Sequence, residues 1–365
     1  MRKLATVRTI TDITPILNAD KIELAHVDGW QVVVRKDDGY KVGDKIVYIE
    51  IDSVVPETPE FEFLRDRKFR VRIIKLRGER SEGLIMPMSI LDPEKEYNIG
   101  DDVTDELEIT KYDPEERKER QDSNQNIKKI IPTRWYMRIP WLRKIILKKY
   151  KDKAEFPKWI VKTDEERIQN MPILFESLKK TKMPLTITEK IDGQSATYFL
   201  VKKLFGYEFG VCSRNYKLDK SSNQYWQIAE QYDIKDKLRT LIKQNKSKSV
   251  VLQGEIIGEG IQGNKYSIKG YDFYAFNLLF DRKRLDYSAM FASLGALGIR
   301  CVPYLGTFMV GEHDTIEDIV TFSGCDTSTL RDGEREGIVC RNQKHHVSFK
   351  CINPNFLLKE GENDN

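Results

Sequence analysis

The sequence predicts an α+β fold, with an all-β domain placed before a larger domain of mixed strands and helices. Three observations support this prediction. The chain has 365 residues, which is enough for two or three domains of about 100–200 residues each. Short strand patterns separated by turn residues fill residues 1–110, whereas strand patterns alternate with helical ones after residue 155. Between these parts, residues 111–154 are strongly charged and are predicted to form a linker.

Residues 1–110 are predicted to form a small β-barrel of the OB type. Runs rich in apolar and β-branched residues at 31–35, 45–51 and 69–74 indicate strands. Turn residues separate these runs, with Gly39 and Gly43 between the first two. About five short strands with turns between them are typical of an OB-type barrel, and a β-sandwich is the alternative that the pattern leaves open.

The charged linker contains a basic stretch at 124–153. This stretch carries ten Lys or Arg against one acid, which gives a local charge of +9, and Trp135, Tyr136 and Trp141 are interleaved with the cations. One interpretation is an arm that neutralises the phosphates of a nucleic acid and stacks on its bases. The other is a solvated amphipathic helix over 141–150 that packs across the domain seam, on a partner or on a membrane surface.

Residues 155–358 are predicted to form the α+β domain. Partial helical spacing of apolar residues predicts helices at about 223–244 and at 286–297. The acidic tail, 359–365, is expected to be frayed. Strands are predicted at 185–188, 196–201, 207–211, 250–253, 272–279, 337–340 and 347–352.

The composition excludes several classes of protein. The net charge is only +4, which is too small for a surface that binds polyanions everywhere. Five scattered cysteines without a C-x-x-C pair argue against a disulfide framework or a structural zinc site, and favour a reducing compartment. No uncharged stretch approaches the roughly 18–20 residues of a membrane span. We therefore expect a soluble intracellular protein, cytoplasmic or nuclear, with no membrane partner.

The motif Thr188-Glu189-Lys190-Ile191-Asp192-Gly193 is the strongest chemical signal. It follows an apolar strand and ends in a glycine, so we expect the Lys190 amine at a strand end, directed into a pocket. Partial burial beside other cations would lower the pKa of Lys190, and a neutral amine can attack phosphorus. The alternative is an ordinary surface turn.

Further polar residues of this domain are predicted close to strand ends, where they can share a site with the motif lysine. They are Ser213, Arg214 and Asn215 at the end of one strand, Glu255 at the end of another ahead of the glycine-rich segment 257–263, and Phe276 in an aromatic strand.

A hairpin is predicted to bring Glu336 and Lys350 together. If residues 342–344 form a three-residue loop, Arg341 pairs with His345. Counting back along both strands places Glu336 opposite Lys350, on the face that carries the motif lysine. These side chains suit a metal-bound nucleoside triphosphate, with the acid at the metal's waters and the lysine at a phosphate oxygen. The alternative is an ordinary cross-strand salt bridge.

Together these motifs resemble those of the covalent nucleotidyltransferase superfamily of ligases and capping enzymes. Lys-x-Asp-Gly, Ser-Arg-Asn, Gly-Glu, the aromatic strand, Glu-Gly-Ile-Val and Ser-Phe-Lys resemble, in order, its motifs I, Ia, III, IIIa, IV and V. Segment 156–170 resembles the lead-in of ATP-dependent RNA ligases. Segments 18–34 and 40–52 resemble the OB domain that one RNA ligase branch carries before its nucleotidyltransferase domain, whereas 124–153 has no counterpart and looks like an insertion.

The resemblance implies an OB domain followed by an adenylyltransferase domain of ATP-grasp-like antiparallel sheets with helices. It implies ATP and Mg²⁺ or Mn²⁺ as cofactors, and Lys190, Lys350 and Arg214 as catalytic residues. Many relatives have a second lysine two places after Lys350, where this chain has Ile352. The implied roles are the lysyl-adenylate for Lys190, adenine binding for Glu189, stacking on adenine for Phe276, contact with ribose or the RNA end for Arg214, and contact with the α-phosphate for Lys350. Asp192, Glu255 and Glu336 would position the waters of the metal ion. Ser213, Asn215 and Glu255 are also counted among the nucleotide-binding residues.

The implied activity is ATP-dependent sealing of RNA ends in three steps. Lys190 attacks the α-phosphorus of ATP, AMP passes to an RNA 5′-phosphate, and a 3′-hydroxyl displaces AMP. The expected partner is RNA, with a nicked duplex as the substrate, and the expected state is a monomer. A capping-type guanylyltransferase or DNA ligase is an alternative, although the sequence ends too soon after Lys350 for the C-terminal OB domain of those enzymes. A non-catalytic OB-fold RNA-binding protein is the other.

Overall fold

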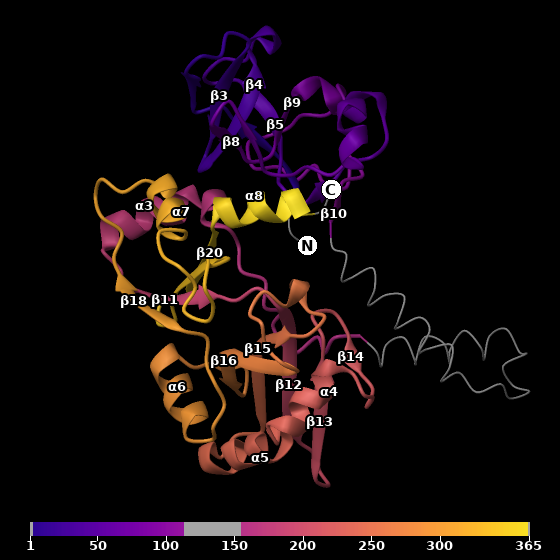
Figure 1. Ribbon diagram of the computed structural model, residues 1–365, viewed down its shortest axis with the longest axis vertical. Coiled ribbons are helices and arrows are strands. Elements are labelled where there is room, and N and C mark those ends of the chain that lie inside the picture. Colours follow the sequence, from indigo (N-terminus) through magenta and orange to yellow (C-terminus); the bar gives the residue numbers. More distant parts are fainter. Residues whose placement is uncertain (1–2, 113–154, 364–365) are drawn as a thin grey trace, which may run out of the picture.

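The structure, a computed structural model, describes residues 3–112 and 155–363. The predicted basic arm and its helix over 141–150 lie outside these residues. Figure 1 shows an N-terminal β domain, coloured indigo to purple, above a larger domain coloured magenta to yellow. The C-terminal helix α8 (Pro354–Asn363) lies where the two domains meet and contacts strand β7 (Ile74–Leu76) of the β domain.

The N-terminal domain is built from short antiparallel strands. Its remaining strands are β1 (Ala5–Thr9), β2 (Asp12–Pro15), β3 (Ile22–Val27), β4 (Trp30–Arg35), β5 (Lys45–Ile49), β6 (Ser53–Val54), β8 (Glu79–Ser81), β9 (Leu84–Pro87) and β10 (Thr110–Lys111), with 3-10 helices η1 (Lys36–Asp38), η2 (Pro59–Arg67) and η3 (Met88–Ile90). The strand orders are β1-β5-β9, β2-β3-β4, β6-β10 and β7-β8. Val7, Val47 and Ile49 of the first sheet are buried in one apolar cluster, and Trp30 and Tyr48 in another.

The prediction of a strand at 69–74 is wrong. Phe69 has a left-handed backbone with φ of 56°, and the strand β7 begins only at Ile74. Phe69, Val71 and Ile73 are all buried. The alternation of apolar residues therefore reflects packing of an irregular segment against the core rather than a paired strand.

The larger domain contains two antiparallel sheets. Its strands are β11 (Leu185–Lys190), β12 (Gln194–Lys202), β13 (Tyr207–Cys212), β14 (Lys217–Leu218), β15 (Ser249–Gly258), β16 (Tyr271–Phe280), β17 (Lys283–Arg284), β18 (Tyr304–Phe308), β19 (Gly337–Asn342) and β20 (Val347–Ile352). One sheet has the order β14-β13-β12-β15-β16-β17 and the other β18-β11-β19-β20. Each of the seven strands predicted for this domain is found.

Helices pack on both sheets. They are η5 (Ile168–Asn170), α3 (Pro172–Thr181), α4 (Gln224–Gln231), α5 (Ile234–Asn245), α6 (Tyr287–Gly295) and α7 (Ile316–Phe322), whereas the short η6 (Gln262–Asn264) lies in the β15–β16 connection. The apolar sides of α4 and α5 pack on the six-stranded sheet, where Ile228 and Leu238 are buried in one cluster with Tyr198. No helix among the described residues is long and apolar enough to cross a membrane.

Two predictions about helices need correction. The single helix predicted at 223–244 is two helices, because Asp233 has a left-handed φ of 46° and interrupts it between α4 and α5. Asn223 caps α4 by accepting a hydrogen bond from the backbone N–H of Trp226. The tail predicted to be frayed is helical in α8 as far as residue 363.

The two domains meet along the segment that leads into the larger domain. The indole N–H of Trp30 donates to Oδ1 of Asn170 at 2.8 Å, and Nδ2 of Asn170 donates to Oε1 of Glu50 at 2.5 Å. The guanidinium of Arg167 lies 3.7 Å from the Asp52 carboxylate. These contacts hold the lead-in segment against the β domain at the point where the chain enters the larger domain.

Candidate active site

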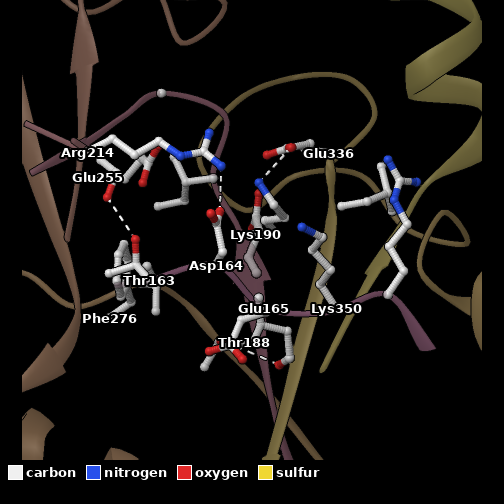
Figure 2. A pocket seen from close by; sticks show the side chains of 18 of the residues that line it. Thr163, Asp164, Glu165, Thr188, Lys190, Arg214, Glu255, Phe276, Glu336 and Lys350 are labelled. Carbon is white, nitrogen blue, oxygen red and sulfur yellow. Dashed lines mark hydrogen bonds and ion pairs between the residues drawn. The ribbon is translucent and has the colours of Figure 1, made fainter. Parts of the chain in front are cut away.

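A cavity of about 290 Å³ lies between the two sheets of the larger domain. Figure 2 shows the amines of Lys190 and Lys350 directed toward the same space. Asp52 of the β domain also lines the cavity. Asp192 and Ser213 do not line it, but the other eight predicted site residues do, namely Glu189, Lys190, Arg214, Asn215, Glu255, Phe276, Glu336 and Lys350.

Strand β11 places Lys190 at the cavity. Lys190 ends β11 and pairs with Gly337, the first residue of β19. Its Nζ donates to Oε1 of Glu336, the residue just before β19, at 2.6 Å. A Cβ at Gly337 would lie 2.2 Å from the carbonyl oxygen of Cys351, so a glycine is needed for β19 to approach β20 here. The lysine amine thus reaches the cavity, as its position at a strand end predicts.

The β19–β20 hairpin has a different register from the predicted one. Its loop has four residues, 343–346, and Lys350 lies opposite Val339 instead of Glu336. The side-chain oxygen of Asn342 accepts a hydrogen bond from a backbone N–H within the loop at 3.0 Å, which favours the longer turn. Glu336 precedes the paired part of β19, yet it lines the same cavity as Lys350.

The charges around Lys190 contradict the low pKa predicted for it. Burial alone would lower the pKa of Lys190, but the carboxylates of Glu336, Glu255 and Asp192 outweigh burial and raise it. Burial raises the pKa of the Glu336 carboxyl to about 7, although the Lys190 ammonium opposes this shift. With these neighbours Lys190 keeps its proton. A nucleophilic amine therefore requires a further positive charge among the carboxylates.

Glu255 was predicted at the end of a strand, but it lies within β15. The strand continues three residues beyond Glu255, with an irregularity in pairing just before Gly254. A Cβ on Gly193 would lie 2.9 Å from Cγ of Glu255. The glycine of the Lys-x-Asp-Gly motif therefore allows the turn after Lys190 to lie directly against Glu255.

Phe276 of β16 and Val339 of β19 give the cavity apolar lining from both sheets. Arg341 ties these strands together, since its Nη1 donates to the carbonyl oxygen of Phe276 at 2.9 Å. Apolar and aromatic side chains with a few fixed polar groups are typical of sites for flat ligands such as a nucleobase.

The Glu189 carboxylate has partners on both oxygens. Oε1 accepts from the Ser328 hydroxyl at 2.5 Å, and Oε2 accepts from the backbone N–H and the hydroxyl of Thr329 at 2.9 and 2.7 Å. These bonds fix the segment that leads to Glu336. The contact of Glu189 with adenine stays a prediction.

Arg214 and Asn215 follow β13, as predicted, and both line the cavity. Nη2 of Arg214 donates to the Asp164 carboxylate at 2.5 Å, which directs the guanidinium along the cavity (Figure 2). Ser213 is buried, and its hydroxyl oxygen accepts from the backbone N–H of Tyr216 at 3.3 Å. The Ser213 side chain therefore belongs to the turn that presents Arg214.

The lead-in segment, 156–170, also lies along the cavity, although none of its residues was predicted to belong to the site. Glu165 pairs with Arg341 at 2.8 Å, and although burial opposes it, Arg341 holds the pKa of Glu165 below its ordinary value. The acidic run 164–166, inside the segment that resembles an RNA ligase lead-in, is the sequence feature that could have identified these site residues. The lining residues from this segment are Thr163, Asp164, Glu165 and Arg167.

Known proteins match both parts of the chain. A model of the RNA ligase family matches residues 183–353, and a model of an OB-fold domain matches residues 4–88. A structure of RNA ligase from Naegleria gruberi, an apo form of a mutant, has 31% sequence identity with this chain, covers 99% of each chain and superposes with a TM-score of 0.79. The chain belongs to the RNA ligase family.

Two further structures of the Naegleria enzyme resemble this member of the RNA ligase family. One, with PPi, has 32% identity, covers 99% of this chain and 100% of its own, and has a TM-score of 0.79. A mutant with ATP and Mn has 32% identity, covers 98% of this chain and 99% of its own, and has a TM-score of 0.78. No curated protein matches the sequence. The predicted order of an OB domain before a nucleotidyltransferase domain is confirmed.

The cavity of this RNA ligase family member suits a hydrated divalent metal ion. Oε2 of Glu336 is buried, and no described residue forms a hydrogen bond with it, so a metal-bound water has an acceptor there. Asp192 and Glu255 act electrostatically on the same lysine as Glu336. Among the described residues, no three His, Cys, Asp or Glu side chains form a group that would bind a metal directly. This arrangement fits a metal ion that the carboxylates contact through its bound waters, and Mg²⁺ keeps several such waters when it binds to proteins.

Proposed function

We propose that the chain is an ATP-dependent RNA ligase that joins a 3′-hydroxyl to a 5′-phosphate through an adenylate on Lys190. The observation that carries this proposal is the Lys190 amine, 2.6 Å from Glu336 in a cavity that also contains Lys350 and Arg214. Structures of the Naegleria relative contain ATP with Mn, AMP with Mn, or PPi, and these ligands support nucleotidyl transfer as the chemistry.

In the proposed first step, the Lys190 nitrogen attacks the α-phosphorus of ATP, a P–N bond forms, and the bond to pyrophosphate breaks. Lys190 must first lose the proton that the surrounding carboxylates hold on it through a raised pKa. A Mg²⁺ or Mn²⁺ ion held through water by Asp192, Glu255 and Glu336 would supply positive charge that favours the neutral amine. Lys350 would stabilise the charge on the α-phosphate.

AMP then passes from Lys190 to an RNA 5′-phosphate, and a 3′-hydroxyl displaces AMP to close the strand. Covalent catalysis of this kind divides one difficult condensation into easier exchanges. We assign adenine stacking to Phe276, and contact with ribose or the RNA end to Arg214 and Asn215, because all three line the cavity with Lys190.

Labelled nucleotides test this proposal. After incubation with labelled ATP and Mg²⁺, wild-type protein should keep the label through denaturing electrophoresis, and Lys190→Ala should carry none. Lys180→Ala, at an exposed lysine on α3, is the matched control and should label like wild type. Label from GTP alone would indicate a capping-type guanylyltransferase. RNA binding without any label would indicate a non-catalytic OB-fold protein.

We further propose a nick in duplex RNA as the substrate and a monomer as the working form. Sealing rates on a nicked RNA duplex, on the same ends without the complementary strand, and on nicked DNA test the substrate. The RNA nick should be sealed fastest, and faster sealing of DNA or of unpaired ends would contradict the proposal. Sedimentation should give one species of 42.7 kDa.

A further inference from the structure

The Asp192 carboxylate, two residues after the proposed nucleophile, is held by a loop outside the two sheets. Its Oδ2 accepts a hydrogen bond from Nζ of Lys265 at 2.5 Å, and its backbone N–H donates to the Tyr266 hydroxyl at 2.9 Å. The Asp192 side chain is only 12% exposed. Two consecutive residues of the β15–β16 connection thus fix both the side chain and the backbone of Asp192.

Lys265 is in turn held by the C-terminal helix. Its ammonium pairs with the Glu360 carboxylate and lies 4.5 Å from the centre of the Phe356 ring. Phe356 and Glu360 are four residues apart, so they share one face of α8. This face therefore offers the ammonium both an opposite charge and an aromatic ring.

The glycine-rich segment that the sequence singles out builds the loop that carries Lys265. Gln262, Gly263 and Asn264 have φ values of 44°, 66° and 49°, so the chain coils tightly just before Lys265. The Asn264 side chain accepts from the backbone N–H of Ile268 at 3.1 Å and donates to its carbonyl oxygen at 3.0 Å. The loop therefore presents Lys265 at a defined position.

We propose that Lys265 and Glu360 are positioning residues of the ligase site, which act on the first step by holding the Asp192 carboxylate. This inference rests on the proposed function. Lys190 stands among acids, so its ammonium attracts the Asp192 carboxylate two residues away. Lys265 gives Asp192 a cation of its own, and Glu360 keeps Lys265 in place. Residues 257–265 and helix α8 thereby acquire a role in adenylation of Lys190.

Single-turnover adenylation of Lys190 tests this assignment. Lys265→Met should slow the step by about tenfold or more, because Asp192 loses its fixed geometry. Lys265→Arg keeps the cation and should stay within about threefold of wild type. Lys269→Met, at an exposed lysine of the same loop, is the matched control and should leave the rate unchanged. Adenylation of Lys265→Met at the wild-type rate would overturn the proposal.

A charge reversal separates positioning of Asp192 from simple attachment of α8. Lys265→Glu combined with Glu360→Lys restores an ion pair between loop and helix, but it places a carboxylate against Asp192. We expect thermal unfolding to return toward the wild-type temperature while adenylation stays slow. Recovery of the wild-type rate in the reversed pair would show that attachment alone matters and would overturn the role of Asp192. Absence of label from wild type, measured in the same assay, would instead refute the proposed function.

Discussion

Lys190 Nζ and Glu336 Oε1 lie 2.6 Å apart where β11 meets β19, and further carboxylates surround the pair. The sequence identifies the lysine and its acidic companions through their motifs. It does not identify the direction in which the pKa of Lys190 shifts, because Asp192, Glu255 and Glu336 come from separate segments. Only the folded distances decide that acids, rather than cations, dominate around the amine.

Glu336→Gln tests the role of this carboxylate. Loss of the carboxylate oxygen that is proposed to accept from a metal-bound water should slow adenylation by about a hundredfold or more. Stability should change by no more than about 1 kcal/mol, because the substitution removes a buried carboxyl whose pKa is already raised to about 7. Labelling with ATP and thermal unfolding measure the two effects, with Glu312→Gln at an exposed position as the control. Adenylation at the wild-type rate would remove Glu336 from the site.

Strands are predicted more reliably than their pairing in this fold. The seven strands of the larger domain follow from their β-branched and aromatic runs, since burial of a pleated surface selects such residues. The register of β19 and β20 depends on one local detail, the hydrogen bond by which the Asn342 side chain closes a four-residue loop. Apolar alternation alone does not determine loop length, so the predicted pairing of Glu336 with Lys350 was wrong.

Gly337→Ala tests the close approach of β19 to β20. The new methyl group would meet the backbone carbonyl of Cys351, so we expect a loss of about 2 kcal/mol of stability and slower adenylation of Lys190, which pairs with Gly337. Gly295→Ala is the control, because a Cβ at the end of α6 meets nothing within 4 Å. It should leave stability unchanged or raise it by up to about 1 kcal/mol. An unchanged melting temperature for Gly337→Ala would contradict the account.

The seam between the domains is a property of the whole molecule. The sequence distinguishes an all-β part from a mixed part, but no residue pattern shows that Arg80 pairs with Glu317 across the seam. Glu82 lies buried beside this pair. Burial raises the pKa of the Glu82 carboxyl to about 7, although Arg80 opposes the shift.

Glu82→Gln tests the electrostatics of the seam through pH. Between about pH 4.5 and 7 the folded state keeps a proton that the unfolded state loses, so the stability due to Glu82 falls as pH rises through this window. Wild type and variant should be equally stable at pH 4, below this window. At pH 8 the variant should be more stable by up to about 3 kcal/mol. Urea unfolding measures the difference, and a difference that does not depend on pH would contradict the raised pKa.

Mass spectrometry of the protein after incubation with ATP and Mg²⁺ tests the central claim most directly. We predict one AMP group in an acid-labile phosphoramidate linkage, on the peptide that contains Lys190, and no such adduct in Lys190→Ala. An unmodified Lys190, or AMP attached to another residue of the wild-type protein, would contradict the account.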